Sequence, residues 1–118
     1  MQEEWDYCQI NMQILDDGQD LFFVSNRLMW LQFFAQASGP YRSYTAGKSS
    51  RIPISSIPGA AYAPQQGNDG HRAILKNLLD ALEEDGWEQT AYKGSHWWEA
   101  RLRRPARPKR AWFRRKGN

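Results

Sequence analysis

Residues 68–88, NDGHRAILKNLLDALEEDGWE, carry the signal that decides the fold. Five aliphatic residues in this stretch repeat at the spacing of a single apolar stripe on an α-helix: Ile74, Leu75, Leu78, Leu79 and Leu82. Asn68 or Asp69 can cap the start of the helix, and Gly86 lies where a left-handed residue commonly ends one. Because so short a helix is unstable alone in water, we expect it to pack on a sheet.

The segments before this helix have strand patterns. Residues 5–14 end in a strict alternation of Ile10, Met12 and Ile14 with polar residues, which is typical of a half-buried strand. Trp5 and Tyr7 fall on the polar side of that alternation. Either a bulge near Cys8 switches the faces, or two aromatic rings lie on the outer face. Further strands are predicted at residues 21–24, 28–37, 41–46 and 51–55.

A closing hairpin is predicted after the helix. Gly94-Ser95 has the composition of a two-residue type II′ loop, which sets the pairing of the flanking strands. In that pairing Trp98 faces the helix and Trp97 faces outward, because side chains alternate between the faces of a sheet. The predicted opposite pairs are Tyr92 with Trp97, Ala91 with Trp98, Thr90 with Glu99, Glu88 with Arg101, and Trp87 with Leu102.

Two short motifs resemble a family of small microbial domains of unknown function. Members of that family open with a Trp-Glu-Tyr strand and have a Leu-rich helix that runs into Gly-Trp-Glu. The corresponding motifs here are Trp5-Asp6-Tyr7 and Gly86-Trp87-Glu88. The resemblance covers about half of the chain and implies an α+β fold but no activity. It also implies that Trp5 and Tyr7 are core residues, which favours the bulge.

Together these patterns predict an α+β fold with an antiparallel sheet of four to five strands in the order β-β-β-α-β-β. One amphipathic helix covers one face of this sheet. Residues 1–103 form a single domain that contains a long Gly/Pro-rich loop at 47–70. Residues 104–118 form a basic, extended C-terminal tail, because prolines at 105 and 108 prevent a helix there.

Charge is distributed very unevenly along the chain. Residues 1–100 carry seven Lys and Arg against thirteen acids, whereas residues 101–118 carry nine Lys and Arg and no acid. An acid-free basic segment suits a nucleic acid or another polyanion, and two aromatic residues inside it can stack on bases. The candidate nucleic-acid contacts are Arg103, Arg104, Arg107, Lys109, Arg110, Trp112, Phe113, Arg114, Arg115 and Lys116.

Three acids, Glu83-Glu84-Asp85, end the predicted helix, where the helix dipole disfavours negative charge. Either solvent screens them, or a cation from Arg103, Arg104 or the tail lies beside them.

Few residues carry catalytic chemistry. One cysteine and two histidines are too few for a structural zinc site, and Cys8 with His96 is a weak candidate for a nucleophile and base. We therefore expect no enzyme activity, no metal and no cofactor. A single cysteine fits a reducing compartment, so the cytoplasm is the predicted location. The sequence has no apolar run of transmembrane length, and its acidic first residues do not read as a secretory signal.

Two functions remain open at this point. The leading hypothesis is a small non-enzymatic module that contacts nucleic acid through its basic tail, in the role of an accessory subunit. The alternative is a protein-interaction or self-association module that uses an aromatic outer face of the sheet. The residues predicted to form that face are Trp30, Phe34, Tyr92 and Trp97.

Overall fold

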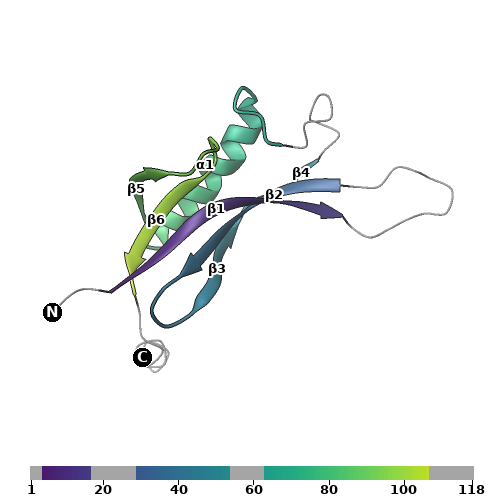
Figure 1. Ribbon diagram of the computed structural model, residues 1–118. Helices are drawn as coiled ribbons and strands as arrows, with labels where there is room; N and C mark the ends of the chain where they lie inside the picture. The colour runs from purple at the N-terminus through teal and green to yellow at the C-terminus, as the bar shows by residue number, and fades with distance from the viewer. Residues whose placement is uncertain (1–3, 17–28, 54–62, 107–118) are drawn as a thin grey trace.

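The computed structural model describes residues 4–16, 29–53 and 63–106, which form a six-stranded antiparallel sheet and one helix (Figure 1). The strand order is β3-β2-β1-β6-β5, and β4 pairs with β2 at the side of this path. The elements are β1 (Trp5–Asp16), β2 (Met29–Ser38), β3 (Ser43–Lys48), β4 (Ile52–Pro53), α1 (Asp69–Glu84), β5 (Glu88–Lys93) and β6 (Ala100–Pro105).

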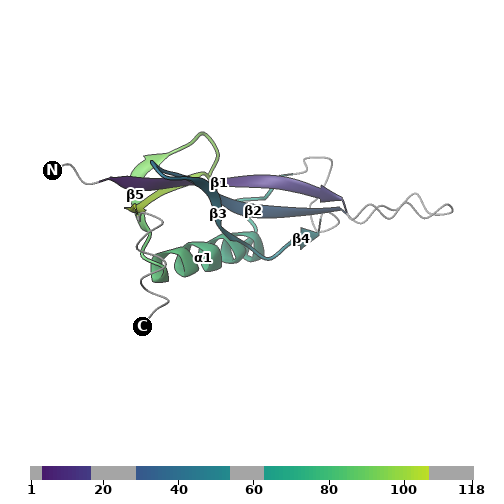
Figure 2. The same ribbon diagram turned by 90° about the horizontal axis from the view of Figure 1, so that it is seen from below.

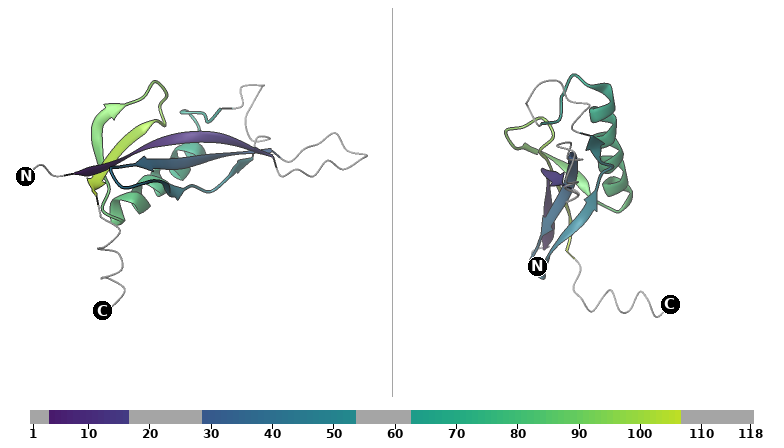
Figure 3. Two further views of the ribbon diagram at one scale, coloured as in Figure 1. Left: turned by 60° about the horizontal axis from the view of Figure 1, so that its bottom comes forward. Right: turned by 90° about the vertical axis from the view of Figure 1, so that its right-hand side faces the viewer.

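The predicted α+β class, with an antiparallel sheet and one helix on a single face, is confirmed (Figures 2 and 3). The sheet has six strands instead of four to five, because Ile52 and Pro53 pair with Leu31 and Trp30 of β2. β6 runs through Pro105, so its last two residues lie past the predicted start of the tail. The return strand predicted at residues 21–24 lies outside the described residues.

β1 is the central strand and carries no bulge. Its pairing with β2 runs without interruption from Tyr7 opposite Ser38 to Asp16 opposite Met29. Tyr7 therefore keeps the outward parity of the strand and is 53% exposed. The expectation of a bulge that buries Trp5 and Tyr7 is wrong, and both rings lie on the face away from α1.

The core lies between α1 and the inner face of the sheet. The apolar stripe predicted from residues 68–88 buries Leu75, Leu78 and Leu82, while Ile74 and Leu79 lie at its margin. Five side chains opposite the helix are almost completely buried: Phe33, Ile10, Leu31, Ile52 and Leu102. Gly47 of β3 lets the helix approach closely, since a Cβ there would lie 3.3 Å from Leu78 Cδ1.

Both predicted ends of the helix are confirmed. The side chain of Asn68 accepts a hydrogen bond from the backbone nitrogen of His71 at 3.1 Å, which satisfies one free N–H of the first turn. Gly86 has a φ of 96°, and the next residue, Trp87, donates its backbone N–H to Leu82 O at 3.0 Å. This ending turns the chain so that Trp87 packs into the core with 2% exposure.

The predicted pairing of the closing hairpin is wrong. Glu88 lies opposite Arg103 and not Arg101, and the loop spans residues 94–99, closed by a hydrogen bond from Gly94 N to Glu99 O. The longer loop brings two indoles onto the core, where Trp97 and Trp98 have ring centroids 6.2 and 6.3 Å from that of Phe33. Burial of both rings outweighs the preference of Gly94-Ser95 for a tight turn.

Candidate functional site

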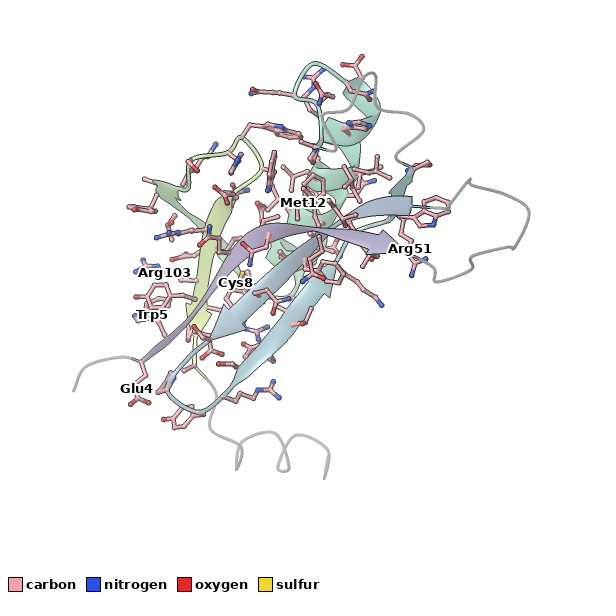
Figure 4. The ribbon with its side chains drawn as sticks, turned by 45° about the vertical axis from the view of Figure 1, so that its right-hand side comes forward. Glu4, Trp5, Cys8, Met12, Arg51 and Arg103 are labelled. Carbon is pink, nitrogen blue, oxygen red and sulfur yellow. The ribbon has the colours of Figure 1, made fainter. Side chains whose placement is uncertain are left out.

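Two arginines of β6 lie on the outer face of the sheet, away from α1. Arg101 and Arg103 pair with Gln9 and Tyr7 of β1, and each stacks on an aromatic ring. The guanidinium carbon of Arg103 is 4.2 Å from the ring centroid of Trp5. Figure 4 shows these two side chains next to each other. The guanidinium carbon of Arg101 is 4.1 Å from the ring centroid of Tyr92. The outer face thus presents cations that are held in place by aromatic rings.

The same face contains an open depression of about 630 Å³. Two exposed tyrosines line it, Tyr7 with 53% and Tyr92 with 60% exposure, together with amide and hydroxyl side chains. The depression therefore combines flat rings with hydrogen-bonding groups. Its lining residues are Tyr7, Cys8, Gln9, Asn11, Gln36, Ser38, Thr90, Tyr92 and Arg101.

The three arginines of β6 differ in their partners. Arg103 donates from Nε to Glu88 Oε1 at 2.7 Å, and Arg104 donates from Nη1 to Asp85 Oδ2 at 2.8 Å. No carboxylate among residues 4–16, 29–53 and 63–106 pairs with Arg101, and its buried Nε has no partner within those ranges. Arg101 thus differs from Arg103 and Arg104, whose guanidinium groups each face a described carboxylate.

Arg104 was predicted to contact nucleic acid, but it lies on the inner side of β6 as part of a polar network. Its side chain is 11% exposed and stacks over Trp87, with 4.4 Å from the guanidinium carbon to the ring centroid. Nη2 donates to Tyr44 Oη at 3.1 Å, and that hydroxyl donates to Asp6 Oδ2 at 2.6 Å. Burial, followed by this hydrogen bond to Asp6, raises the pKa of Tyr44.

The network explains the acids at the end of α1. The sequence left open whether solvent screens Glu83-Glu84-Asp85 or a cation of the chain lies beside them. For Asp85 the cation is confirmed, because Arg104 Nη1 donates both to its carboxylate and, at 3.1 Å, to its carbonyl oxygen. This places a positive charge at the negative end of the helix dipole. Arg104 is thus a structural residue and not part of the outer face.

The basic segment begins beside the outer-face arginines. The backbone nitrogen of Ala106 donates to Glu4 O at 2.9 Å, which holds the end of β6 against the start of β1. The remaining predicted nucleic-acid contacts follow directly in sequence but lie outside the described residues: Arg107, Lys109, Arg110, Trp112, Phe113, Arg114, Arg115 and Lys116.

The four residues predicted to form an aromatic outer face do not gather into one patch. Trp30 and Phe34 lie on the outer parity of β2 but are only partly exposed, and Tyr92 lies on β5 at the other side of the sheet. Trp97 was predicted to face outward, and this is wrong. It packs edge-on against Phe33 and donates from Nε1 to Pro64 O at 3.2 Å.

Cys8 and His96 show no arrangement for nucleophilic catalysis. Cys8 is 3% exposed in β1, and burial raises the pKa of its thiol to about 12. A thiol with so high a pKa is protonated at neutral pH and is a poor nucleophile. His96 stacks on Trp98 at a centroid distance of 4.5 Å, and its Nδ1 lies 3.1 Å from Glu99 Oε1.

We expect the thiol of Cys8 to react with maleimide at pH 8 at least about 100-fold more slowly in the folded chain than in urea, because it is buried and protonated. Well below pH 9 both thiols are mostly protonated, although at pH 8 the unfolded thiol, with its pKa of 9.0, already has a larger thiolate fraction than the folded one. Between pH 9.0 and about 12 only the unfolded thiol loses its proton, so Cys8 makes the fold less stable as the pH rises through that range. Equal labelling rates in both states would contradict the burial of Cys8.

The described part of the chain contains no group of three or more His, Cys, Asp or Glu side chains placed to hold a metal ion. Within the same residues, no helix has both the length and the apolar character needed to cross a bilayer.

The sequence did not predict the depression, and of its lining residues only Tyr92 was among the predicted site residues. Tyr7, Gln9 and Asn11 share one parity of β1, a regularity visible in the sequence, but Gln36 and Arg101 join them only through strand pairing. Comparison of the chain with known protein families, curated proteins and solved structures finds no match. The resemblance to small microbial domains of unknown function therefore stays a prediction.

Proposed function

We propose that this protein is a small, non-enzymatic nucleic-acid-binding module. Phosphates are held by Arg101 and Arg103 on the outer face and by the basic segment at residues 107–118. The observation that carries the proposal is the course of β6, which presents two outward arginines and then continues directly into six more Lys and Arg residues without an acid. Such a row of cations gains affinity for a polyanion by releasing its counterions.

The partners of the outer-face arginines support this proposal. Arg101 has no carboxylate partner in the described ranges, and the ion pair of Arg103 is open to solvent, with side-chain exposures of 41% for Arg103 and 57% for Glu88. An exposed ion pair is worth at most about 1 kcal/mol, so a phosphate can compete with Glu88 for Arg103. Phosphate contacts of this kind position a nucleic acid without reading its sequence.

The alternative of self-association through an aromatic face has less support. Self-association through the predicted aromatic face needs those rings to form one patch, but Trp97 packs against Phe33, and polar side chains occupy the outer face of β1 and β2, namely Gln9, Asn11 and Gln36. Polar side chains at the centre of the face favour a polar ligand over a second protein surface.

The test uses the full chain with the six bases beyond Ala106 replaced by glutamine: Arg107, Lys109, Arg110, Arg114, Arg115 and Lys116. We expect this variant to bind a fluorescent single-stranded 20-mer about 100-fold more weakly than the unmodified chain at about 0.1 M salt, measured by anisotropy. On a single strand, each phosphate contact contributes roughly 0.7 to the slope of log affinity against log salt concentration. Losing three or four contacts therefore removes roughly 2 to 3 logarithmic units of affinity for each tenfold step in salt.

A control separates local contacts from net charge. Arg72→Gln combined with Lys76→Gln removes two exposed charges from α1, on the opposite side of the sheet. This control should weaken binding by less than about 3-fold, because its charges lie far from the proposed ligand path. If affinity falls equally per charge removed in both variants, or does not fall in the six-residue variant, the proposal is wrong.

A further inference from the structure

We infer that the depression on the outer face is a binding site for an unpaired nucleobase, so that the preferred ligand is a single-stranded nucleic acid. This inference rests on the proposed function and names the form of nucleic acid that it concerns. It is carried by three features of the depression: exposed rings, amide side chains that bond to no described residue, and a guanidinium that pairs with no described carboxylate.

The rings provide stacking surfaces. Tyr7 and Tyr92 are among the most exposed large side chains of the described residues. Both line the depression, Tyr7 from β1 and Tyr92 from β5. Arg101 of the intervening β6 lies over the Tyr92 ring, with its guanidinium carbon 4.1 Å from the ring centroid. Bases in single strands stack on tyrosine rings and on guanidinium planes, and they do so without regard to sequence.

The amides provide hydrogen bonds for a base edge. Gln9 lies directly opposite Gln36 in the pairing of β1 with β2, a position in which the Cβ atoms are about 5 Å apart. Asn11 follows on the same face. An amide carries both a donor and an acceptor, which is the pattern that base edges also present.

No described residue donates to or accepts from the side chains of Gln9, Asn11 or Gln36, although all three are partly buried. Other glutamines of the chain do have partners: Gln32 donates to Ser49 O and Gln89 donates to Glu83. None of their polar atoms is among the buried atoms without a partner, so these amides are open to solvent and can exchange water for the edge of a base that stacks on the neighbouring rings.

Duplexes fit this site poorly. A base inside a duplex is already stacked on both faces and paired along its edge, so its ring cannot reach Tyr7 or Tyr92 without leaving the helix. The phosphates of a duplex remain accessible to the arginines and the basic segment. The structure thus predicts electrostatic binding to both forms, with the depression adding affinity for single strands alone.

The experiment compares a single-stranded 20-mer of thymidine with a 20-base-pair duplex, using the full chain and the variants Tyr7→Ala and Tyr92→Ala. Each variant should lose about 10-fold in affinity for the single strand, the usual loss for one base stack, and stay within about 2-fold for the duplex. Tyr41→Ala is the matched control, since Tyr41 is 47% exposed and lies outside the depression. It should change neither affinity.

A second measurement needs no variant. A single strand with 5-iodouracil, photocrosslinked to the unmodified chain, should form adducts at Tyr7 or Tyr92. The base site would be overturned by adducts confined to residues 107–118, or by tyrosine variants that bind the single strand normally. In either case, salt-dependent binding to both the single strand and the duplex would still support the proposed function. If the unmodified chain binds neither nucleic acid, the proposed function fails, and the base site fails with it.

Discussion

Trp98→Ala is expected to lower the free energy of unfolding by about 3–5 kcal/mol, the range for emptying a large aromatic side chain from a core. Trp98 is 7% exposed and contacts both the core ring of Phe33 and the imidazole of His96. Because its neighbours come from different elements, they cannot close the space that the indole leaves. Urea denaturation followed by circular dichroism measures the loss.

The neighbouring indole is the comparison. Trp97→Ala should cost about 2 kcal/mol, because Trp97 is partly exposed but packs against Phe33 and makes a hydrogen bond to Pro64 O. This differs from the small cost that an outward-facing Trp97 would give. The structure of the loop would be contradicted if Trp98→Ala lowered the free energy of unfolding by less than about 1 kcal/mol, or if Trp97→Ala lowered it more than Trp98→Ala does.

Arg104→Met is the second large effect, with an expected loss of about 2–3 kcal/mol in the free energy of unfolding. Methionine keeps much of the apolar stem over Trp87 but removes the cation that faces Tyr44 and Asp85. Asp6, which is 7% exposed, then keeps its buried carboxylate without the nearby positive charge. Asp85 adds little, since its side chain is 68% exposed and solvent screens it.

Arg103→Met provides a matched control on the same strand. It also removes one arginine and one ion pair, but both side chains of that pair are largely exposed, so the loss should stay within about 1 kcal/mol. Thermal or urea melts of the two variants distinguish the inner arginine from the outer one. Similar losses for both would show that β6 does not place Arg103 and Arg104 on different faces.

Local chemistry explains which parts of the fold could be predicted from the sequence. The helix has its cap at Asn68 and its left-handed end at Gly86, and both act within one or two turns of the chain. The closing hairpin depends instead on contacts between Trp97 and Phe33, which are far apart in sequence. The preference of Gly94-Ser95 for a tight turn contributes less free energy than burying the indole rings. A prediction based on Gly94-Ser95 alone therefore gave the wrong strand pairs.

The first strand shows a related contrast. The alternation of β1 already placed Trp5 and Tyr7 on the outer face, whereas the resemblance to the microbial family favoured the core. Arg103 stabilises the outward Trp5 by stacking on it, and that contact depends on the pairing of β1 with β6. An aromatic residue on the polar side of a strand was therefore the signal that pointed to the site.

The candidate site was only partly visible in the sequence. The charge of residues 101–118 can be read directly, and it names a class of ligand without a structure. The depression draws its residues from four strands, so its members appear unrelated until β1, β2, β5 and β6 are placed side by side. Arg101 is an example, because the predicted hairpin paired it with Glu88 and so neutralised its charge.

The salt dependence of binding tests the central claim most directly. The unmodified chain should bind a single-stranded 20-mer with an affinity that falls as the salt concentration rises, with a log–log slope near −3.5 for about five phosphate contacts. An anisotropy titration between about 0.05 and 0.3 M salt measures that slope. A slope near zero, or no binding at the lowest salt concentration, would contradict the proposal that this protein holds nucleic acid through the arginines of β6 and the basic segment that follows them.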